Sequence, residues 1–165
     1  DVIEHDTIEM NLPHLDGETI SAFFNPQEGV DKTGQLAKSN EILKDVSDAD
    51  AIVIGLPMHN FGIPSNLKAY IDRLCRIGVT VKFTEAGPQG LLKDKPVYVV
   101  CARGSDFTGD LKPYDFALPY IAHIFSFIGL KSVQVFGVEG VNLGEGAAEK
   151  AMELTSSQIK EALAA

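Results

Sequence analysis

Three short runs of apolar, mostly β-branched residues constrain the fold of this chain more than any other feature. They span residues 51–56 (AIVIGL), 97–102 (VYVVCA) and 132–138 (SVQVFGV). Near-continuous apolar runs of this length are typical of strands that are buried on both faces, as in a parallel sheet. Turn signals and then helical patterns follow them. The sequence therefore predicts a single α/β domain over residues 1–165, with parallel strands joined by right-handed crossovers.

The spacing of apolar residues predicts four helices, over residues 35–46, 63–74, 116–128 and 146–164. The third of these is apolar almost all round and needs cover on every side, which favours a second subunit as well as the sheet. Residues 2–10 (VIEHDTIEM) are more polar than the three apolar runs, and they predict a strand at the edge of the sheet.

Composition excludes several classes of function. The formal net charge of −9 comes without any Lys/Arg cluster that would neutralise the phosphates of a nucleic acid or an anionic membrane. The two cysteines, Cys75 and Cys101, make no disulfide framework, and the four histidines lack metal-ligand spacing. The sequence contains no signal peptide and no apolar run long enough to span a membrane. These features predict a cytoplasmic protein.

Ligands of open parallel sheets bind beyond the carboxyl ends of the strands. After the first run, residues 57–65 (PMHNFGIPS) pack polar and aromatic groups into a turn just before a helix. Backbone N–H groups there could hold a planar, anion-forming ring system, and a rigid loop shaped by its prolines is the alternative. After the second run, Arg103 could offset negative charge on a ligand and Gly104 allows close backbone approach, although a solvated Arg in a Gly turn gives the same pattern.

A long segment, residues 76–90 (RIGVTVKFTEAGPQG), lies between these two loops. It contains several turn residues and one aromatic residue, Phe83. We expect a loop here, and loops of this length in compact domains often act as lids over a site.

Five stretches occur in one order along the chain: PMHNFGIPSNLKAYID, GVTVKFTEAGPQGLL, CARGS, FIGL and VEGV. Together they closely resemble the FMN-dependent NADH-azoreductases and NAD(P)H quinone oxidoreductases, which are dimeric enzymes of the flavodoxin-like fold. The resemblance runs from Val2 onward. It implies a flavodoxin-like, three-layer α/β/α fold with a parallel sheet, an FMN cofactor and a homodimer.

The resemblance also implies which residues contact FMN. The first loop would lie along the edge of the isoalloxazine ring, with Asn60 and the Phe61 amide near flavin N5 and O4, where hydride is accepted. The second loop would border the pyrimidine side, where amides and a cation stabilise the reduced flavin. The implied contacts are Pro57, Met58, His59, Asn60, Phe61, Ala102, Arg103, Gly104 and Ser105.

Two aromatic residues, Phe83 and Phe127, match positions that wall the substrate slot above the flavin from opposite subunits. For Phe127, plain core packing is the alternative. His59 stands where the family often carries Tyr; the role of its backbone is kept, whereas a stacking role for its side chain stays open. A proton donor to the substrate is another role considered for His59, and a plain loop histidine is the favoured alternative. The implied reaction has two steps: NADH or NADPH gives hydride to flavin N5 and leaves, and a quinone or azo compound then takes its place. No side chain acts as a nucleophile in this reaction.

Two alternatives to this function stay open. A flavodoxin-like dimer that binds a partner but no flavin would have the same fold. A thiol nucleophile at Cys101 is the other alternative, although no His–Asp arrangement accompanies this residue, and a buried Cys that packs as a small apolar side chain fits the pattern better.

The amino-terminal part of the family pattern has no match in this chain. Family members begin with a strand, a Ser-rich loop that cradles the FMN phosphate, and a first helix, whereas this chain begins at Asp1. In the strand order 2-1-3-4-5 of this fold, the unmatched strand would lie between residues 2–10 and residues 51–56. We therefore expect a segment to be missing upstream, with unpaired strand edges and weakened phosphate binding as the result.

Overall fold

The three apolar runs form one parallel sheet in the computed structural model, which describes residues 1–24 and 34–164. Strand β4 (Val97–Ala102) lies between β1 (Ile52–Pro57) and β5 (Val133–Val138). In this register Val97 pairs with Ile52 on one side and with Val133 on the other. The three predicted strands are confirmed to within one residue at each end.

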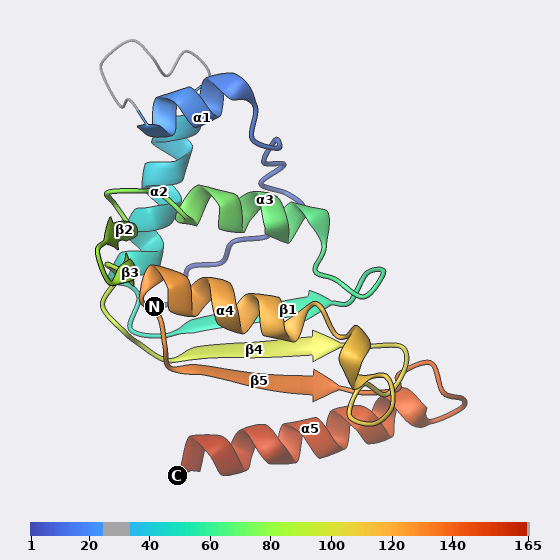
Figure 1. Cartoon of the computed structure of the whole chain (residues 1–165). Coiled ribbons are helices and arrows are strands. Elements are labelled where there is room, and N and C mark those ends of the chain that lie inside the picture. Colours follow the sequence, from blue (N-terminus) through green and yellow to red (C-terminus); the bar gives the residue numbers. More distant parts are fainter. Residues whose placement is uncertain (25–33, 165) are drawn as a thin grey trace.

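Helices cover both faces of this sheet (Figure 1). Helices α2 (Gln35–Asp48), α3 (Ser65–Leu74) and α4 (Leu118–Ile128) pack on one side, and α5 (Ala147–Ala164) lies on the other side against β5. The four predicted helices are thus present, and the three-layer α/β/α arrangement is confirmed. The core forms where the first three helices meet the sheet, and it includes Ile42, Leu67, Val97, Val99, Ile121 and Phe125.

A further helix, α1 (Gly17–Phe24), packs against α2 away from the sheet and was not predicted. Its start is marked by Asp16, whose carboxylate accepts a hydrogen bond of 2.8 Å from the Thr19 amide. A short polar side chain in this position satisfies an amide that the first helical turn leaves unpaired.

The segment between α3 and β4 forms a hairpin instead of the predicted loop. Strands β2 (Val81–Thr84) and β3 (Gly87–Gly90) pair antiparallel, and the hairpin is fastened to α4 by a hydrogen bond of 3.0 Å from Leu92 N–H to the Ile128 carbonyl. The backbones touch at Gly90 and Gly129, where a Cβ atom on either residue would overlap the backbone opposite. The hairpin is therefore a fixed extension of the helical layer.

Residues 2–10 do not form the predicted edge strand. The backbone of residues 1–6 has no regular secondary structure, and residues 7–11 form turns. Side-chain hydrogen bonds hold this segment to the helices: His5 bonds to the Tyr70 hydroxyl at 2.8 Å and to Asp45 at 3.0 Å, and Thr7 accepts a bond of 3.0 Å from Asn66. The prediction fails because a strand needs a neighbouring strand, and these anchors hold the segment beside α2 and α3.

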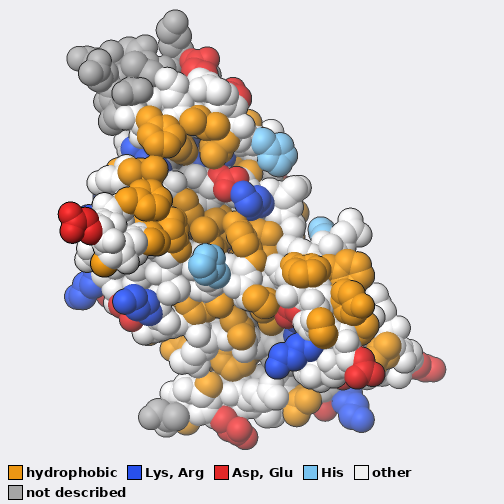
Figure 2. All heavy atoms as spheres, in the orientation of Figure 1, with side chains coloured by type: hydrophobic (Ala, Val, Ile, Leu, Met, Phe, Trp, Pro, Cys, Tyr) orange, Lys and Arg blue, Asp and Glu red, His pale blue; other side chains and the backbone are white. Residues whose placement is uncertain are grey.

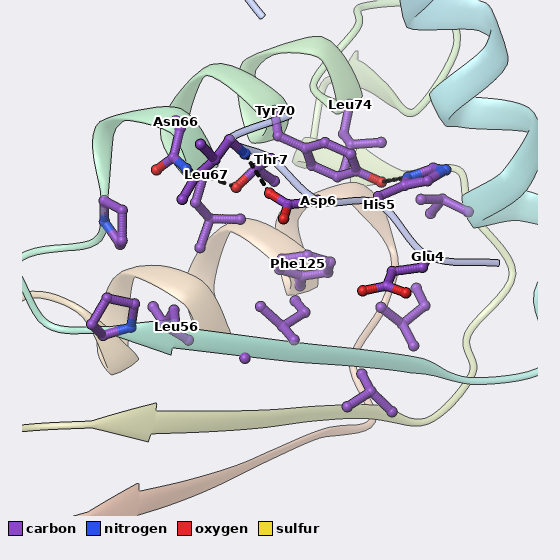
Figure 3. Close-up of a pocket in the computed structure, with 18 of the residues that line it drawn as sticks. Glu4, His5, Asp6, Thr7, Leu56, Asn66, Leu67, Tyr70, Leu74 and Phe125 are labelled. Carbon is purple, nitrogen blue, oxygen red and sulfur yellow. Dashed lines mark hydrogen bonds between the residues drawn. The ribbon is translucent and has the colours of Figure 1, made fainter. Parts of the chain in front are cut away.

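A groove of about 390 Å³ separates this segment from β1 (Figure 3). Its walls are residues 4–8 on one side, β1 on the other, and apolar side chains of α3 and α4, including Leu67 and Phe125. Ile52 N–H bonds to Pro96 O and Met58 N–H to Ala102 O, both towards β4. Because backbone groups alternate along a parallel strand, those of Val53 and Gly55 point to the opposite, open edge, which borders the groove.

Candidate functional site

The carboxyl ends of all three parallel strands meet at one end of the molecule (Figure 1). The loops that leave β1, β4 and β5 come together there, which is where ligands bind in open parallel sheets. Two of these loops are the ones that the sequence marks, residues 57–64 and residues 101–105. The structure therefore brings together the two groups of residues that were predicted to contact a flavin.

The loop after β1 is a tight, strained turn. His59 and Gly62 exchange two backbone hydrogen bonds of 2.9 Å, and the two residues between them have positive φ values, 47° at Asn60 and 68° at Phe61. This is the geometry of a two-residue type I′ hairpin, which Asn accommodates and Gly prefers at its second position. A side chain such as Phe in the left-handed region costs about 1–2 kcal/mol. Strain of this kind concentrates at binding sites.

Aromatic side chains surround Phe61. Its ring lies 6.4 Å from that of Phe107 and 6.3 Å from that of Tyr114, measured between ring centroids. Its carbonyl accepts a hydrogen bond of 3.0 Å from the Phe116 amide. About half of Phe61 stays exposed, at 49%, and Tyr114 and Phe116 are also exposed. In Figure 2 apolar side chains gather at this end of the molecule, so the turn offers a flat ligand an aromatic surface.

Phe107, Tyr114 and Phe116 were not among the predicted site residues. They lie in the segment between β4 and α4, which includes a short 3₁₀ helix (Lys112–Tyr114). The only signal was the density of aromatic residues in a segment that follows a strand. These residues reach the site because the 3₁₀ helix turns the chain back beside the residues 57–62 loop.

Backbone donors are available on both predicted loops. Within the described residues, the amides of Asn60, Phe61, Gly104 and Ser105 donate to no protein acceptor. The second loop is nevertheless pinned, because the carbonyls of Gly104 and Ser105 accept bonds of 3.1 Å from Asn142 and Gly140. Fixed amides on two neighbouring loops suit a planar ring that carries acceptors along its edge, as the isoalloxazine ring of FMN does.

The side chain of Arg103 is buried and faces inward, which differs from the orientation expected of a ligand contact. Only 4% of Arg103 is exposed, and its guanidinium bonds to Asp115 at 2.5 Å and to Glu139. It also lies over the Phe107 ring, 5.2 Å from its centroid. Two carboxylates already neutralise this cation and it faces inward, so no unpaired charge is directed at a ligand, and its contact with flavin stays a prediction. The Nε atom of Arg103 has no hydrogen-bond partner among the described residues.

The remaining residues of the two loops differ in how far they can contact a ligand. Pro57, His59 and Ala102 are exposed at the strand ends, whereas Met58 packs partly against the core. Cys101 is fully buried, and burial raises the pKa of its thiol to about 11, so it is a protonated core residue at neutral pH. This environment does not suit a thiol nucleophile.

Phe83 and Phe127 lie far from the loops within one chain. Phe83 is 64% exposed on the β2–β3 hairpin, at the end of the molecule opposite the carboxyl ends of the sheet. Phe127 is half-buried near the carboxyl end of α4, where it borders the same hairpin at Pro88 and Gln89. One chain therefore does not bring these rings to the loops after β1 and β4, so their predicted role requires a second subunit.

The described residues contain no group of three or more His, Cys, Asp or Glu side chains placed to hold a metal ion. Among the helices that the structure describes, none is both long and apolar enough to cross a bilayer.

Comparisons with known proteins agree with the fold and with the position of the site. The sequence profile of the flavodoxin-like fold matches residues 1–163. An FMN-dependent NADH:quinone oxidoreductase of Cellvibrio japonicus is 40% identical, and the match covers 100% of this chain and 82% of the relative. A protein of the same name from Herminiimonas arsenicoxydans is 44% identical, with 99% and 82% covered.

Solved structures of similar proteins also have this fold. An azoreductase from Bacillus anthracis strain Sterne superposes with a TM-score of 0.84 at 30% identity, over 94% of this chain and 77% of that one. An FMN-dependent NADH-azoreductase from Bacillus anthracis strain Ames Ancestor, solved in complex with FMN, gives 0.82 at 28% identity, over 95% and 79%.

A parallel sheet between two helical layers, with loops that meet at the carboxyl ends of the strands, defines an open α/β protein, and the profile match places it in the flavodoxin-like class. The relatives narrow this class further. The chain belongs to the flavodoxin-like family that contains the FMN-dependent NADH:quinone oxidoreductases and NADH-azoreductases.

Proposed function

We propose that this chain is an FMN-dependent oxidoreductase that uses NADH to reduce quinones. The observation that carries the proposal is the strained Asn60–Phe61 turn, which holds two free amides beside the free amides of Gly104 and Ser105. The names of the relatives, which are 40% and 44% identical, support both the cofactor and the reaction. When bound, FMN supplies a two-electron carrier that accepts hydride at N5 and passes it on.

The residues of the two loops bind and orient the flavin. The Asn60 and Phe61 amides would donate to the edge of the ring system, and the Gly104 and Ser105 amides to its pyrimidine side. Donors that are already fixed cost little reorganisation as charge develops on the ring, so they stabilise the reduced form. Phe61, Tyr114 and Phe116 supply the apolar surface that keeps water from the reacting face.

The electron acceptor is an aromatic compound that stacks on the flavin. Quinones are the first choice because the relatives carry that name, and azo compounds are the second because two structural neighbours are azoreductases. A ping-pong order follows if donor and acceptor use the same face of the ring in turn. The choice between NADH and NADPH follows the relatives, which use NADH.

The second subunit is part of the proposal. The outward side of α4 carries the half-buried apolar side chains of Tyr120, Ile124 and Phe127 beside the exposed His123 and Ser126, and the hairpin adds the exposed ring of Phe83. In Figure 2 apolar side chains extend over the α3 and α4 face. A homodimer formed through this face would cover these side chains and bring a partner's hairpin to the loop end of α4.

Absorbance spectroscopy tests the proposal. The purified protein is titrated with FMN, then with NADH under argon, and finally with a soluble quinone. We expect a shift of the flavin band on binding, bleaching with NADH and recovery with the quinone. A protein that leaves the FMN spectrum and fluorescence unchanged would favour a flavodoxin-like module that binds a partner without flavin.

A further inference from the structure

A buried ion cluster lies directly behind the strained turn. It consists of Arg103, Asp115 and Glu139, and we call it the Arg103 cluster. The guanidinium Nη1 donates to Asp115 Oδ2 at 2.5 Å, and Nη2 donates to Glu139 Oε1. Arg103 is 4% exposed, and the side chains of Asp115 and Glu139 are 10% and 19% exposed. Charge-assisted bonds in such surroundings are strong and hold their partners in fixed positions.

Each carboxylate uses its second oxygen to fix a neighbouring backbone segment. Asp115 Oδ1 accepts bonds of 3.0 Å from the amides of Ala117 and Leu118 at the start of α4. Glu139 Oε2 accepts a bond of 2.9 Å from the Phe107 amide. The cluster therefore ties the loop after β4 to the start of α4 and to the loop after β5.

All three tethers of Phe61 lie on the segments that the cluster fixes. Phe107 is held by Glu139 and by the stacked guanidinium, whereas Tyr114 and Phe116 are the sequence neighbours of Asp115. The rings of Phe107 and Tyr114 contact the Phe61 ring, and the Phe116 amide bonds to the Phe61 carbonyl. A residue in an unfavourable backbone conformation persists only where its surroundings hold it there.

We propose that Asp115 and Glu139 are positioning residues that hold the strained Asn60–Phe61 turn in the conformation that binds flavin. They act through Arg103 and the aromatic residues and do not touch the ligand. The inference rests on the proposed function, because it deepens the role of the same site. Gly137 belongs to the arrangement, since a Cβ at this position would overlap Glu139 and lie 2.6 Å from Arg103 Nη2.

Two charge variants and one steric variant test the inference. Asp115→Asn keeps an oxygen for the helix amides, because Asn serves there as well as Asp, but it removes the charged bond to Arg103. Glu139→Gln removes the other charged bond. Either change leaves Arg103 with one carboxylate, so the buried cation stays paired and the fold is retained. Gly137→Ala separates Arg103 from Glu139 without changing any charge.

Asp110→Asn is the matched control, since it makes the same change of charge at an exposed site in the same loop. We expect each of the three cluster variants to weaken FMN binding by about tenfold or more, measured by quenching of FMN fluorescence, because small displacements of positioned groups are costly. The control should stay within about twofold. If Asp115→Asn and Gly137→Ala both bind FMN as the wild type does, the inference is overturned.

A double-mutant cycle separates positioning from a general structural role. Phe61→Gly adopts a positive φ without strain, so the turn no longer needs the cluster. In the Phe61→Gly background, we expect Asp115→Asn to weaken FMN binding by less than about threefold, because the coupling has been removed. An equal loss in both backgrounds would show that Asp115 does not act through this turn, and would overturn the inference.

Amide hydrogen exchange in the FMN-free protein gives a readout that does not depend on the proposed function. The His59 and Gly62 amides are protected by the bonds that close the turn. We expect these two amides to exchange about tenfold faster in Asp115→Asn and Glu139→Gln, whereas the Val99 amide in the core keeps its rate. Unchanged exchange overturns the inference, while failure of the wild-type protein to bind FMN counts against the proposed function alone.

Discussion

Phe61 occupies a backbone conformation that suits glycine, in a loop where glycine would be the stable choice. The aromatic ring is the evident gain, since it contacts Phe107 and Tyr114 and leaves about half of its surface exposed for a ligand. Phe61 therefore lowers the stability of the turn and in return supplies an aromatic surface for a ligand.

Two truncations of Phe61 measure this strain. Both Phe61→Ala and Phe61→Gly delete the ring, but only Gly accepts a φ of 68° freely. We expect Phe61→Gly to be the more stable of the two by about 1 kcal/mol in urea denaturation. The same pair at Phe83, which lies in strand β2, should show the reverse order, because Gly weakens a strand. An Ala variant of Phe61 as stable as the Gly variant would contradict the assignment of strain.

Cys101 and Cys75 supply a test against thiol chemistry. Burial raises the pKa of each thiol to about 11, so both are neutral at pH 8. We expect iodoacetamide to leave both thiols unmodified in the native protein and to label them in urea, as read by mass spectrometry. Rapid labelling of native Cys101 would reopen the nucleophile hypothesis.

The same shift predicts a pH dependence of stability. Between about pH 9 and pH 11 the native thiol keeps its proton while the unfolded thiol loses it, so the native state binds more protons. The free energy of unfolding therefore falls as the pH rises through this range. The fall should be shallower in Cys101→Ala than in the wild type when urea denaturation is compared at pH 8 and pH 10.

At the residue level, the sequence predicted where the loops after β1 and β4 would meet, but not what the side chain of Arg103 would contact. Strand ends are readable because apolar runs mark the strands, and parallel strands bring their carboxyl ends together. The inward turn of Arg103 was not readable, because its partners Asp115 and Glu139 lie 12 and 36 residues further along the chain.

At the level of elements, near-continuous apolar runs made β1, β4 and β5 predictable, and the lack of such a run hid the hairpin, although Val53 of β1 and Val135 of β5 are exposed. In β2 only Val81 is buried, and the next three residues are exposed, so the strand lacks the alternation that identifies one. Residues 2–10 gave the opposite error, since their pattern suited a strand but side-chain hydrogen bonds hold them beside α2 and α3, across a groove from the open edge of β1.

The contact between the hairpin and α4 gives an element-scale prediction. A Cβ at Gly90 would overlap the backbone at Gly129, and backbone atoms cannot move aside cheaply. We expect Gly90→Ala to destabilise the protein by about 2 kcal/mol or more, measured by thermal or urea unfolding. Gly109→Ala is the control, because nothing lies within 4 Å of its added Cβ and the change should be nearly neutral.

For the whole molecule, two exposed apolar side chains allow a test of the proposed homodimer. Phe83 and Leu154 are almost equally exposed, at 64% and 63%, but Phe83 is on the hairpin beside α4 and Leu154 is on α5 on the other side of the sheet. We expect Phe83→Glu to shift the molar mass from dimer towards monomer in light scattering, since a buried unpaired charge is costly. Leu154→Glu should leave the dimer intact, and equal effects would place the interface elsewhere.

The topology of the sheet also determines the order in which the chain can assemble. In the sheet Ile52 must find Val97, and Val97 must find Val133, so every strand pair closes a long loop. The hairpin β2–β3, by contrast, pairs neighbours along the chain. Closing a long loop costs conformational entropy before the strand pair gains its contacts, so sheets of this kind fold slowly. We therefore expect the hairpin and the helices to form first, and the sheet edge at the carboxyl ends of the strands to be completed last.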